Sequence, residues 1–182
     1  MTKILIIFTF ILTFFLISCG QTNKKSTAKN VEALEVMVDT SLIVIMKVDN
    51  STSYVYPFLR DFNYPELTTN DLEKIEKTLL DFTKDYNIEQ EKQYEEITAK
   101  YPNFKFDKNQ FIIDLSRYKR QYYATTNENG EKEVWINCFC NVLVGDWRKD
   151  LIIVRDGGNC FFNLKINLET EKYYDVMMNG HA

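Results

Sequence analysis

The sequence predicts a single α+β domain in which one or two helices pack on a curved antiparallel meander sheet. Between residues 70 and 101, apolar residues recur every three or four positions, which is typical of an amphipathic helix. From residue 110 the apolar period becomes two, which is typical of strands with two different faces. Turn signals separate the later segments, and strands joined by tight turns form an antiparallel meander.

The first strand is expected over residues 41–49, a short β-branched run that ends at the turn-prone residues 49–51. The preceding residues 31–38 fit either an edge strand or a short helix. Residues 53–58 give a weaker signal for an extended segment, which ends at Pro57.

The main helix is expected to begin at Asn70, which can act as its cap, with Glu73 returning a hydrogen bond three residues later. Its apolar stripe consists of Leu72, Ile75, Leu79, Phe82 and Tyr86. Asn87 is the expected end of this helix. A second, more polar helix is expected over residues 89–100, before Pro102, with an inner face made of Tyr94, Ile97 and Tyr101.

Alternating apolar and polar residues predict a run of strands in the second half of the chain. Asn129-Gly130 and Gly157-Gly158 supply hairpin turns between them, and residues 169–171 supply another. The expected strands cover residues 110–122, 134–142, 151–154, 162–168 and 173–178. This order of elements resembles the cystatin-like group of folds, a two-layer architecture, and that resemblance implies no activity.

The first nineteen residues carry the signals of a secreted protein. Lys3 is followed by an apolar run over residues 4–17, which has the length of a signal-peptide core and is short for a membrane span of about 20 residues. The run leads into Leu16-Ile17-Ser18-Cys19, which resembles the lipobox of bacterial lipoproteins. The resemblance implies cleavage before Cys19 and attachment of diacylglycerol and palmitate to this residue.

This resemblance sets the expected domain organisation and location. Residues 1–18 would be the signal peptide, residues 19–30 a lipidated cysteine with a polar, flexible tether, and residues 31–182 a single domain. The lipid on Cys19 makes the membrane the first expected partner. Gly20 differs from the aspartate typical of inner-membrane retention, which favours the periplasmic side of the outer membrane.

The charge balance bears on the other partners. The chain has 22 basic and 26 acidic residues, so it lacks the basic footprint of a nucleic-acid-binding protein. The sequence contains no pattern for a cofactor or metal. Asp146, Asp150 and Asp156 lie near turns but do not follow the spacing of a calcium-binding loop.

Three cysteines remain once Cys19 carries lipid. Cys138 and Cys140 are two residues apart on one expected strand, so they share a face and do not easily bridge each other. Cys160 would reach one of them only from an adjacent strand in the right register. The pattern favours buried thiols, with a structural disulfide as the alternative.

No catalytic group assembles from the sequence. His181 is the only histidine and lies next to the C-terminus, which makes it a poor base for a cysteine nucleophile. An enzyme would have to use a thiol or carboxylates such as Asp114 and Asp156.

The strongest candidate for binding is a strand with cationic and aromatic side chains. Tyrosine and arginine are the residue types that anchor interfaces, although arginine stems also cover ordinary sheet faces. A loop tryptophan adds a second candidate contact. The predicted binding residues are Arg117, Tyr118, Lys119, Arg120, Tyr122 and Trp147.

A further resemblance covers residues 66–182. The sequences RYKRQY at 117–122, WINCFC at 135–140, DGGNCFF at 156–162 and NGHA at 179–182 resemble those of small uncharacterised lipoproteins of Bacteroidetes-type bacteria. This resemblance implies no activity. The sequence therefore favours a non-catalytic binding or interaction lipoprotein of the cell envelope, with an envelope enzyme or an immunity or inhibitor-type protein as alternatives.

Overall fold

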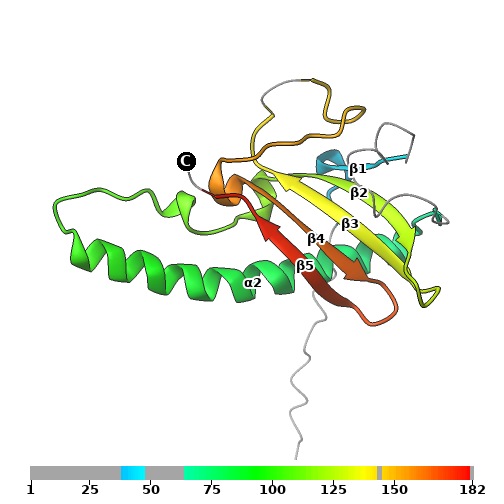
Figure 1. Ribbon diagram of the computed structural model, residues 1–182, viewed down its shortest axis with the longest axis horizontal. Helices are drawn as coiled ribbons and strands as arrows, with labels where there is room; N and C mark the ends of the chain where they lie inside the picture. Colours follow the sequence, from blue (N-terminus) through cyan, green and yellow to red (C-terminus); the bar gives the residue numbers. More distant parts are fainter. Residues whose placement is uncertain (1–37, 48–63, 143–144, 181–182) are drawn as a thin grey trace, which may run out of the picture. The chain divides into compact units, whose positions relative to one another are not determined.

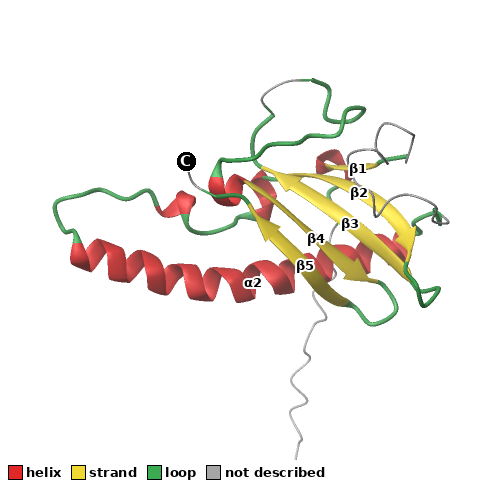
Figure 2. Ribbon diagram, viewed as in Figure 1, coloured by secondary structure: helices red, strands yellow, loops and turns green. Residues whose placement is uncertain are grey.

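A computed structural model describes residues 38–47, 64–142 and 145–180, and shows one helix packed against a five-stranded sheet (Figures 1 and 2). The predicted α+β class is confirmed. The expected signal peptide, Cys19, the tether and the segments at 31–37 and 48–63 lie outside the described residues, as does His181.

Helix α2 spans Thr69–Lys100 and begins with a capping box at Thr68 and Asp71. The amide of Asp71 donates to Thr68 Oγ1 over 3.2 Å, and the amide of Thr68 donates to Asp71 Oδ2 over 2.8 Å. The observed cap therefore lies two residues before the one predicted at Asn70 and Glu73. Aspartate at the third helical position closes the box here, where the prediction required glutamate.

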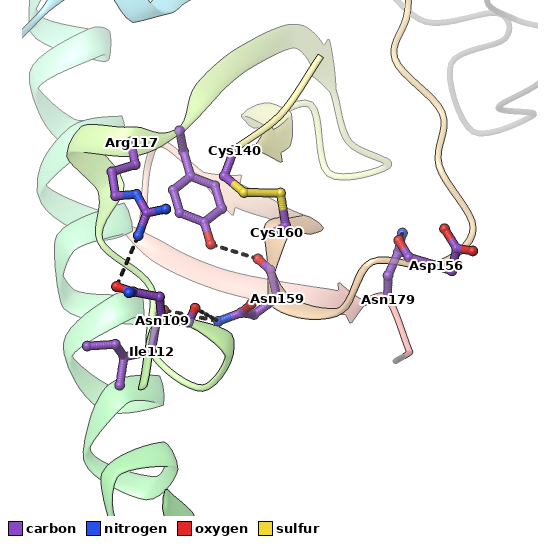
Figure 3. The surroundings of a disulfide bond; sticks show 9 residues. Asn109, Ile112, Arg117, Cys140, Asp156, Asn159, Cys160 and Asn179 are labelled. Carbon is purple, nitrogen blue, oxygen red and sulfur yellow. Dashed lines mark hydrogen bonds between the residues drawn. A yellow bond between two sulfur atoms is a disulfide. The ribbon is translucent and has the colours of Figure 1, made fainter. Parts of the chain in front are cut away.

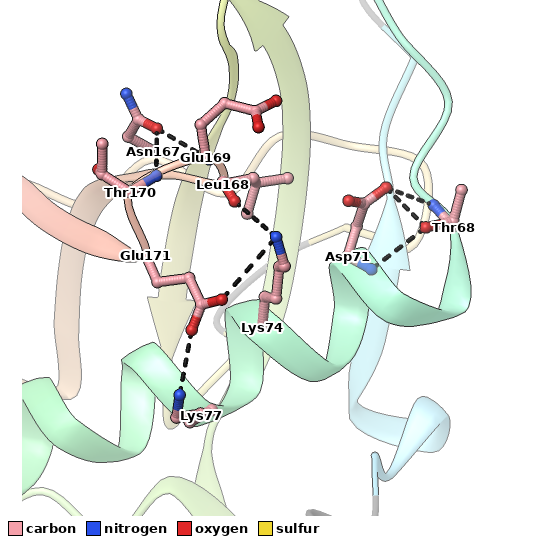
Figure 4. A network of polar contacts seen from close by, with 9 residues as sticks. All are labelled: Thr68, Asp71, Lys74, Lys77, Asn167, Leu168, Glu169, Thr170 and Glu171. Atoms are coloured by element: carbon pink, nitrogen blue, oxygen red, sulfur yellow. Dashed lines mark hydrogen bonds and ion pairs between the residues drawn. The ribbon is translucent and has the colours of Figure 1, made fainter.

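Further contacts fix this end of α2 against the sheet (Figure 4). Lys74 Nζ donates to the carbonyl of Leu168 over 2.9 Å, and Lys77 pairs with Glu171 at 3.0 Å. Asp71 also pairs with Lys132 at 2.9 Å. Burial opposes ionisation of Asp71, but the hydrogen bonds from Lys132 and Thr68 outweigh it and lower its pKa.

Helix α2 continues without a break through Asn87, so the predicted division into two helices is wrong. Asn87 directs its side chain at the returning chain: Nδ2 donates to the carbonyl of Ile113 over 2.8 Å, and Oδ1 accepts from the amide of Ile113 over 2.7 Å. Because the side-chain amide has this partner, it does not compete for the helix's own backbone. Of the predicted inner face, Tyr94 packs edge-to-face against Phe111, whereas Tyr101 is 43% exposed.

The sheet has the order β1-β2-β3-β4-β5. Its strands are β1 at Ile43–Ile45, β2 at Lys119–Thr126, β3 at Lys132–Phe139, β4 at Phe161–Asn167 and β5 at Lys172–Met178. Strands β2 to β5 form the predicted antiparallel meander, whereas β1 pairs with β2 in parallel. The long connection through α2 brings the chain back in the same direction as β1.

The main core lies between α2 and one face of the sheet. The apolar stripe of α2 is buried there, with Ile75 and Leu79 fully inaccessible and Phe82 4% exposed. The face opposite contributes Tyr122, Val134, Ile136, Cys138, Phe162, Leu164 and Ile166. All buried residues of α2 lie between Asp71 and Thr83, so its second half extends past the core.

The second face of the sheet is covered by the loop over residues 145–154, where a strand at 151–154 was predicted. Two buried amide side chains hold this loop. Gln121 Nε2 donates to the carbonyls of Trp147 and Asp150 over 2.8 and 2.7 Å, and Asn137 Nδ2 donates to that of Ile152 over 2.7 Å. These side chains satisfy backbone groups that a strand partner would otherwise satisfy, so the segment is buried without joining the sheet.

The segment before β2 also differs from the prediction. Residues 110–118 form no strand; short 3₁₀ turns occupy Lys108–Gln110 and Leu115–Arg117. Asp107 and Asp114 cap these turns by accepting hydrogen bonds from the amides two residues later. Such local bonds compete with sheet pairing, and here they outweigh the alternating pattern.

Candidate functional site

A cavity of about 1010 Å³ lies between the second half of α2, the segment over residues 106–118 and the turn before β4. It is open to solvent on one side, and its walls combine aromatic rings, amides and carboxylates. The side chains that matter for its chemistry are Tyr86, Gln90, Gln93, Phe111, Arg117 and Asp156.

The helical wall consists of Tyr86, Gln90, Gln93 and Ile97. Their spacing of four, three and four residues places them on one face of α2. The face continues the buried stripe of the first half, but the sheet no longer covers it. The side-chain amides of Gln90 and Gln93 have no hydrogen-bond partner among the residues that the structure describes.

The opposite wall is built from the capped turns. Asn109 connects them: its Nδ2 donates to Asp107 Oδ1 over 2.9 Å, and its Oδ1 accepts from Arg117 over 3.0 Å. Arg117 is exposed and keeps further donors that point to solvent or cavity. This wall is therefore fixed by its own hydrogen bonds.

The floor surrounds a disulfide between Cys140 and Cys160 (Figure 3). Beside it, the Tyr118 hydroxyl donates to the carbonyl of Asn159 over 2.9 Å. Asn159 in turn donates through Nδ2 to the carbonyl of Ile112 over 3.0 Å, which ties the floor to the opposite wall. Burial raises the pKa of Tyr118, so this residue remains a neutral donor.

Beside the floor, Gly157 allows the backbone to lie close to the Phe161 ring. Gly157 has φ of +90°, and a Cβ at this position would lie 2.8 Å from ring carbons of Phe161. The predicted turn is thus present, but it leads from a loop into β4 and does not join two strands. Asn179 holds the preceding loop by donating to the carbonyls of Val154 and Asp156 over 2.7 and 2.9 Å.

The disulfide resolves the alternatives for the cysteines. Phe139 at the end of β3 faces Phe161 at the start of β4. Cys140 follows Phe139 and Cys160 precedes Phe161, so the two cysteines lie opposite each other and form the disulfide. Cys138 remains a free thiol in the main core. Burial raises the pKa of Cys138 far above its ordinary value, which disfavours the reactive thiolate.

Two of the predicted binding residues, Arg120 and Tyr122, are buried, with 3% and 0% of their surface exposed. Both contact Glu76 of α2: Arg120 Nη2 lies 3.3 Å from Glu76 Oε2, and the Tyr122 hydroxyl donates to Glu76 Oε1. Burial is the main cause that raises the pKa of Tyr122. These residues form a buried polar cluster between helix and sheet.

The other predicted binding residues divide between two places. Arg117 and Tyr118 line the cavity, although Tyr118 is buried. Trp147 is also buried, at 6% exposure, where it packs on Phe139 and covers the second face of the sheet. Lys119 is half-buried, with its ammonium 5.9 Å from the Trp147 ring. Trp147 is thus part of the loop cover, and Lys119 at the start of β2 lies beside it; neither residue lines the cavity.

Both carboxylates considered for catalysis line the cavity. Asp114 caps its turn by accepting from the amide and hydroxyl of Ser116 over 3.1 and 2.7 Å. Asp156 has no side-chain partner among the described residues. Within those residues, no three His, Cys, Asp or Glu side chains gather as a metal-binding group.

Sequence reasoning missed Gln90, Gln93 and Asn109. The signal for the first two was their helical spacing with Tyr86 and Ile97, which becomes visible only when residues 69–100 are taken as one helix. None of the helices that the structure describes has the length and apolar content needed to cross a bilayer. No protein-family model matches this chain, and no curated protein or solved structure matches it either.

Proposed function

We propose that this protein is a lipid-anchored protein of the cell envelope that binds a neutral, hydrogen-bonding ligand in the cavity beside α2. The observation that carries the binding proposal is the contrast between the cavity's walls. The floor and the 106–118 wall are fixed by a disulfide and internal hydrogen bonds, whereas the amides of Gln90 and Gln93 on the helical wall have no partner within the described ranges. A rigid cavity with a few free polar groups is the usual form of a binding site.

The composition of the walls supports a neutral ligand. Side-chain amides supply both donors and acceptors, and Tyr86 and Phe111 offer apolar ring surface. Among the lining residues that the structure describes are three carboxylates, those of Asp107, Asp114 and Asp156, and one guanidinium, that of Arg117. An anionic ligand would meet this negative balance at close range, so a neutral molecule with an apolar face fits better.

A binding role fits the reactive groups better than catalysis does. Asp114 is engaged as a cap, Cys140 and Cys160 are joined, and Cys138 is buried in the core with a raised pKa. Of the two carboxylates considered for catalysis, Asp114 and Asp156, only Asp156 lacks a side-chain partner among the described residues. A catalytic mechanism requires a second group in reach whose pKa suits proton transfer. The cavity-lining groups with shifted pKa values are Tyr86 and Tyr118, and burial raises both pKa values, which keeps the two hydroxyls neutral.

The proposed location is the periplasmic side of the outer membrane, with a lipid on Cys19. The lipobox-like sequence is the main support for this proposal. The Cys140–Cys160 disulfide adds to it, because disulfides persist in oxidising compartments outside the cytoplasm.

Metabolic labelling tests the anchor. Cells given radioactive palmitate should label the wild-type protein, which should sediment with membranes. The Cys19→Ser variant should remain unlabelled and unprocessed. Equal labelling of the two proteins would contradict the anchor without affecting the binding proposal.

Site-directed photocrosslinking tests the cavity. A benzophenone amino acid at Gln93 should capture a ligand in the native host, whereas the same group at the exposed Lys84, outside the cavity, should not. Filling the cavity with Gln90→Trp should abolish the product, and the matched Lys84→Trp variant should leave it intact. A product that forms equally from both positions, or that survives Gln90→Trp, would refute the cavity as the binding site.

A further inference from the structure

The end of α2 presents an aromatic tip, defined here as residues 101–106. Phe104 is 68% exposed, the largest fraction among the large apolar side chains of the described residues, and Tyr101 is 43% exposed. Figure 1 shows this segment at the end of α2 that extends past the strands. Exposed aromatic rings grouped at one point are unusual unless they contact a partner.

The tip has a defined conformation. The amide of Phe104 donates to the carbonyl of Tyr101 over 3.0 Å, which closes the turn after the helix. The ring of Phe104 lies 6.4 Å from that of Tyr101 and 6.4 Å from that of Phe106, so the three rings form a row. A preformed row loses little conformational entropy when it binds.

The charges at the tip differ from those of the whole chain. Residues 97–106 contain Lys100 and Lys105 and no acid, whereas the chain has a formal net charge of −4. Lys100 Nζ lies 5.3 Å from the centre of the Tyr101 ring. The nearest acids in sequence, Glu96 and Asp107, flank the segment on its two sides. The aromatic row is therefore accompanied by two cations with no acid between them.

We propose that this tip inserts into the headgroup region of an anionic lipid bilayer. Aromatic rings favour the membrane interface because they are apolar with polarisable faces, and lysines reach from there to anionic headgroups. The choice of a bilayer over a protein partner rests on the anchor at Cys19 proposed above. The chain from Cys19 to Val38 extends at most about 65 Å, so the domain stays close to the surface.

The two attachments would differ in kind. The lipid holds the chain to the membrane, and the tip gives a weak, reversible second contact that is promoted by the high local concentration of the surface. Because α2 is a continuous helix, a tip in the headgroups would set the direction of the whole domain. The cavity lies along the same half of α2 and would then face the membrane-proximal space.

Vesicle co-sedimentation of the lipid-free mature chain, residues 19–182 with Cys19→Ser, tests the proposal independently of lipidation and of the cavity ligand. Vesicles of phosphatidylethanolamine and phosphatidylglycerol serve as the probe. Phe104→Ser should weaken partitioning by about tenfold, which corresponds to withdrawing most of one phenyl ring. Met177→Ser is the matched control, since Met177 is 65% exposed on β5, and it should change partitioning less than about twofold.

Trp fluorescence supplies a second measurement. Trp135 and Trp147 are buried, so Phe104→Trp adds the one exposed reporter in the described chain, and brominated lipids should quench it. Met177→Trp should not be quenched. Absence of wild-type partitioning, equal loss in the Phe104→Ser and Met177→Ser variants, or an unquenched Phe104→Trp would each overturn the proposal. Because Phe104 is exposed, an unchanged unfolding midpoint should confirm that its variants fold.

Discussion

Removal of the Cys140–Cys160 disulfide should destabilise the domain by an amount that follows from its loop. The two cysteines are 20 residues apart, and closing a loop of this length restricts the unfolded chain by about 3 kcal/mol. The double variant Cys140→Ala/Cys160→Ala removes the cross-link and prevents Cys138 from forming a new one. We therefore expect its free energy of unfolding to fall by about 3 kcal/mol.

Urea unfolding of the lipid-free mature chain measures this loss. With a denaturant slope of about 2 kcal/mol/M, the unfolding midpoint should fall by about 1.5 M. Dithiothreitol should lower the wild-type midpoint to that of the double variant and should leave the variant unchanged. Cys138→Ala should remain sensitive to the reductant, because it keeps the cross-link. A loss below about 1 kcal/mol, or a wild-type midpoint that ignores the reductant, would refute the reasoning.

Three further predictions concern α2. Glu76→Gln leaves buried Arg120 without its carboxylate and should cost about 3–5 kcal/mol in denaturant unfolding. Asn87→Ala removes both hydrogen bonds to the Ile113 backbone and should cost about 2 kcal/mol in the same assay. The pKa of Asp71 is lowered on folding, so its stabilising effect is complete above its ordinary pKa of about 3.9 and is lost as the pH falls through the lower folded value. The melting temperatures of wild type and Asp71→Asn should therefore converge from about pH 5 to about pH 2.

Exposed residues provide the controls for the first two of these predictions. Glu73→Gln and Asn103→Ala make the same chemical changes at exposed positions and should alter stability by less than about 0.5 kcal/mol. A Glu76→Gln protein as stable as the Glu73→Gln protein would show that Arg120 finds another partner. An Asn87→Ala protein as stable as Asn103→Ala would show that its bridge contributes nothing. A constant gap between wild type and Asp71→Asn across the acid range would contradict the lowered pKa.

The parts of the fold predicted from sequence are those set by local burial patterns. The apolar stripe from Ile75 to Phe82 and the alternation in β3 and β4 each indicate which face of that one helix or strand is buried. The structure confirms these faces. The continuous helix was missed because asparagine is a common residue at helix ends. The hydrogen-bond partner of the Asn87 side chain, Ile113, is 26 residues away in the sequence. The strand expected over residues 110–122 begins only at Lys119, because Asp107 and Asp114 cap local turns in the segment before it.

The candidate site was less predictable because it depends on contacts distant in sequence. Alternation separated the two faces of β2 but gave no sign that both are covered, one by α2 and the other by the 145–154 loop. Arg120 and Tyr122 therefore looked like surface residues, although they contact Glu76. The disulfide likewise required the register of β3 against β4, which turn positions alone do not determine.

The two covers of the sheet differ in how they are held, which has a kinetic consequence. Helix α2 closes its face with a continuous apolar stripe, whereas the 145–154 loop is held largely by the amides of Gln121 and Asn137 and by Trp147. Breaking those few contacts frees the loop while leaving the meander paired, so the loop should open as a separate unit. Amide hydrogen exchange should accordingly be fast at Ile152, whose N–H donates to the Gln121 side chain, and slow at the centre of β3, which exchanges through global unfolding.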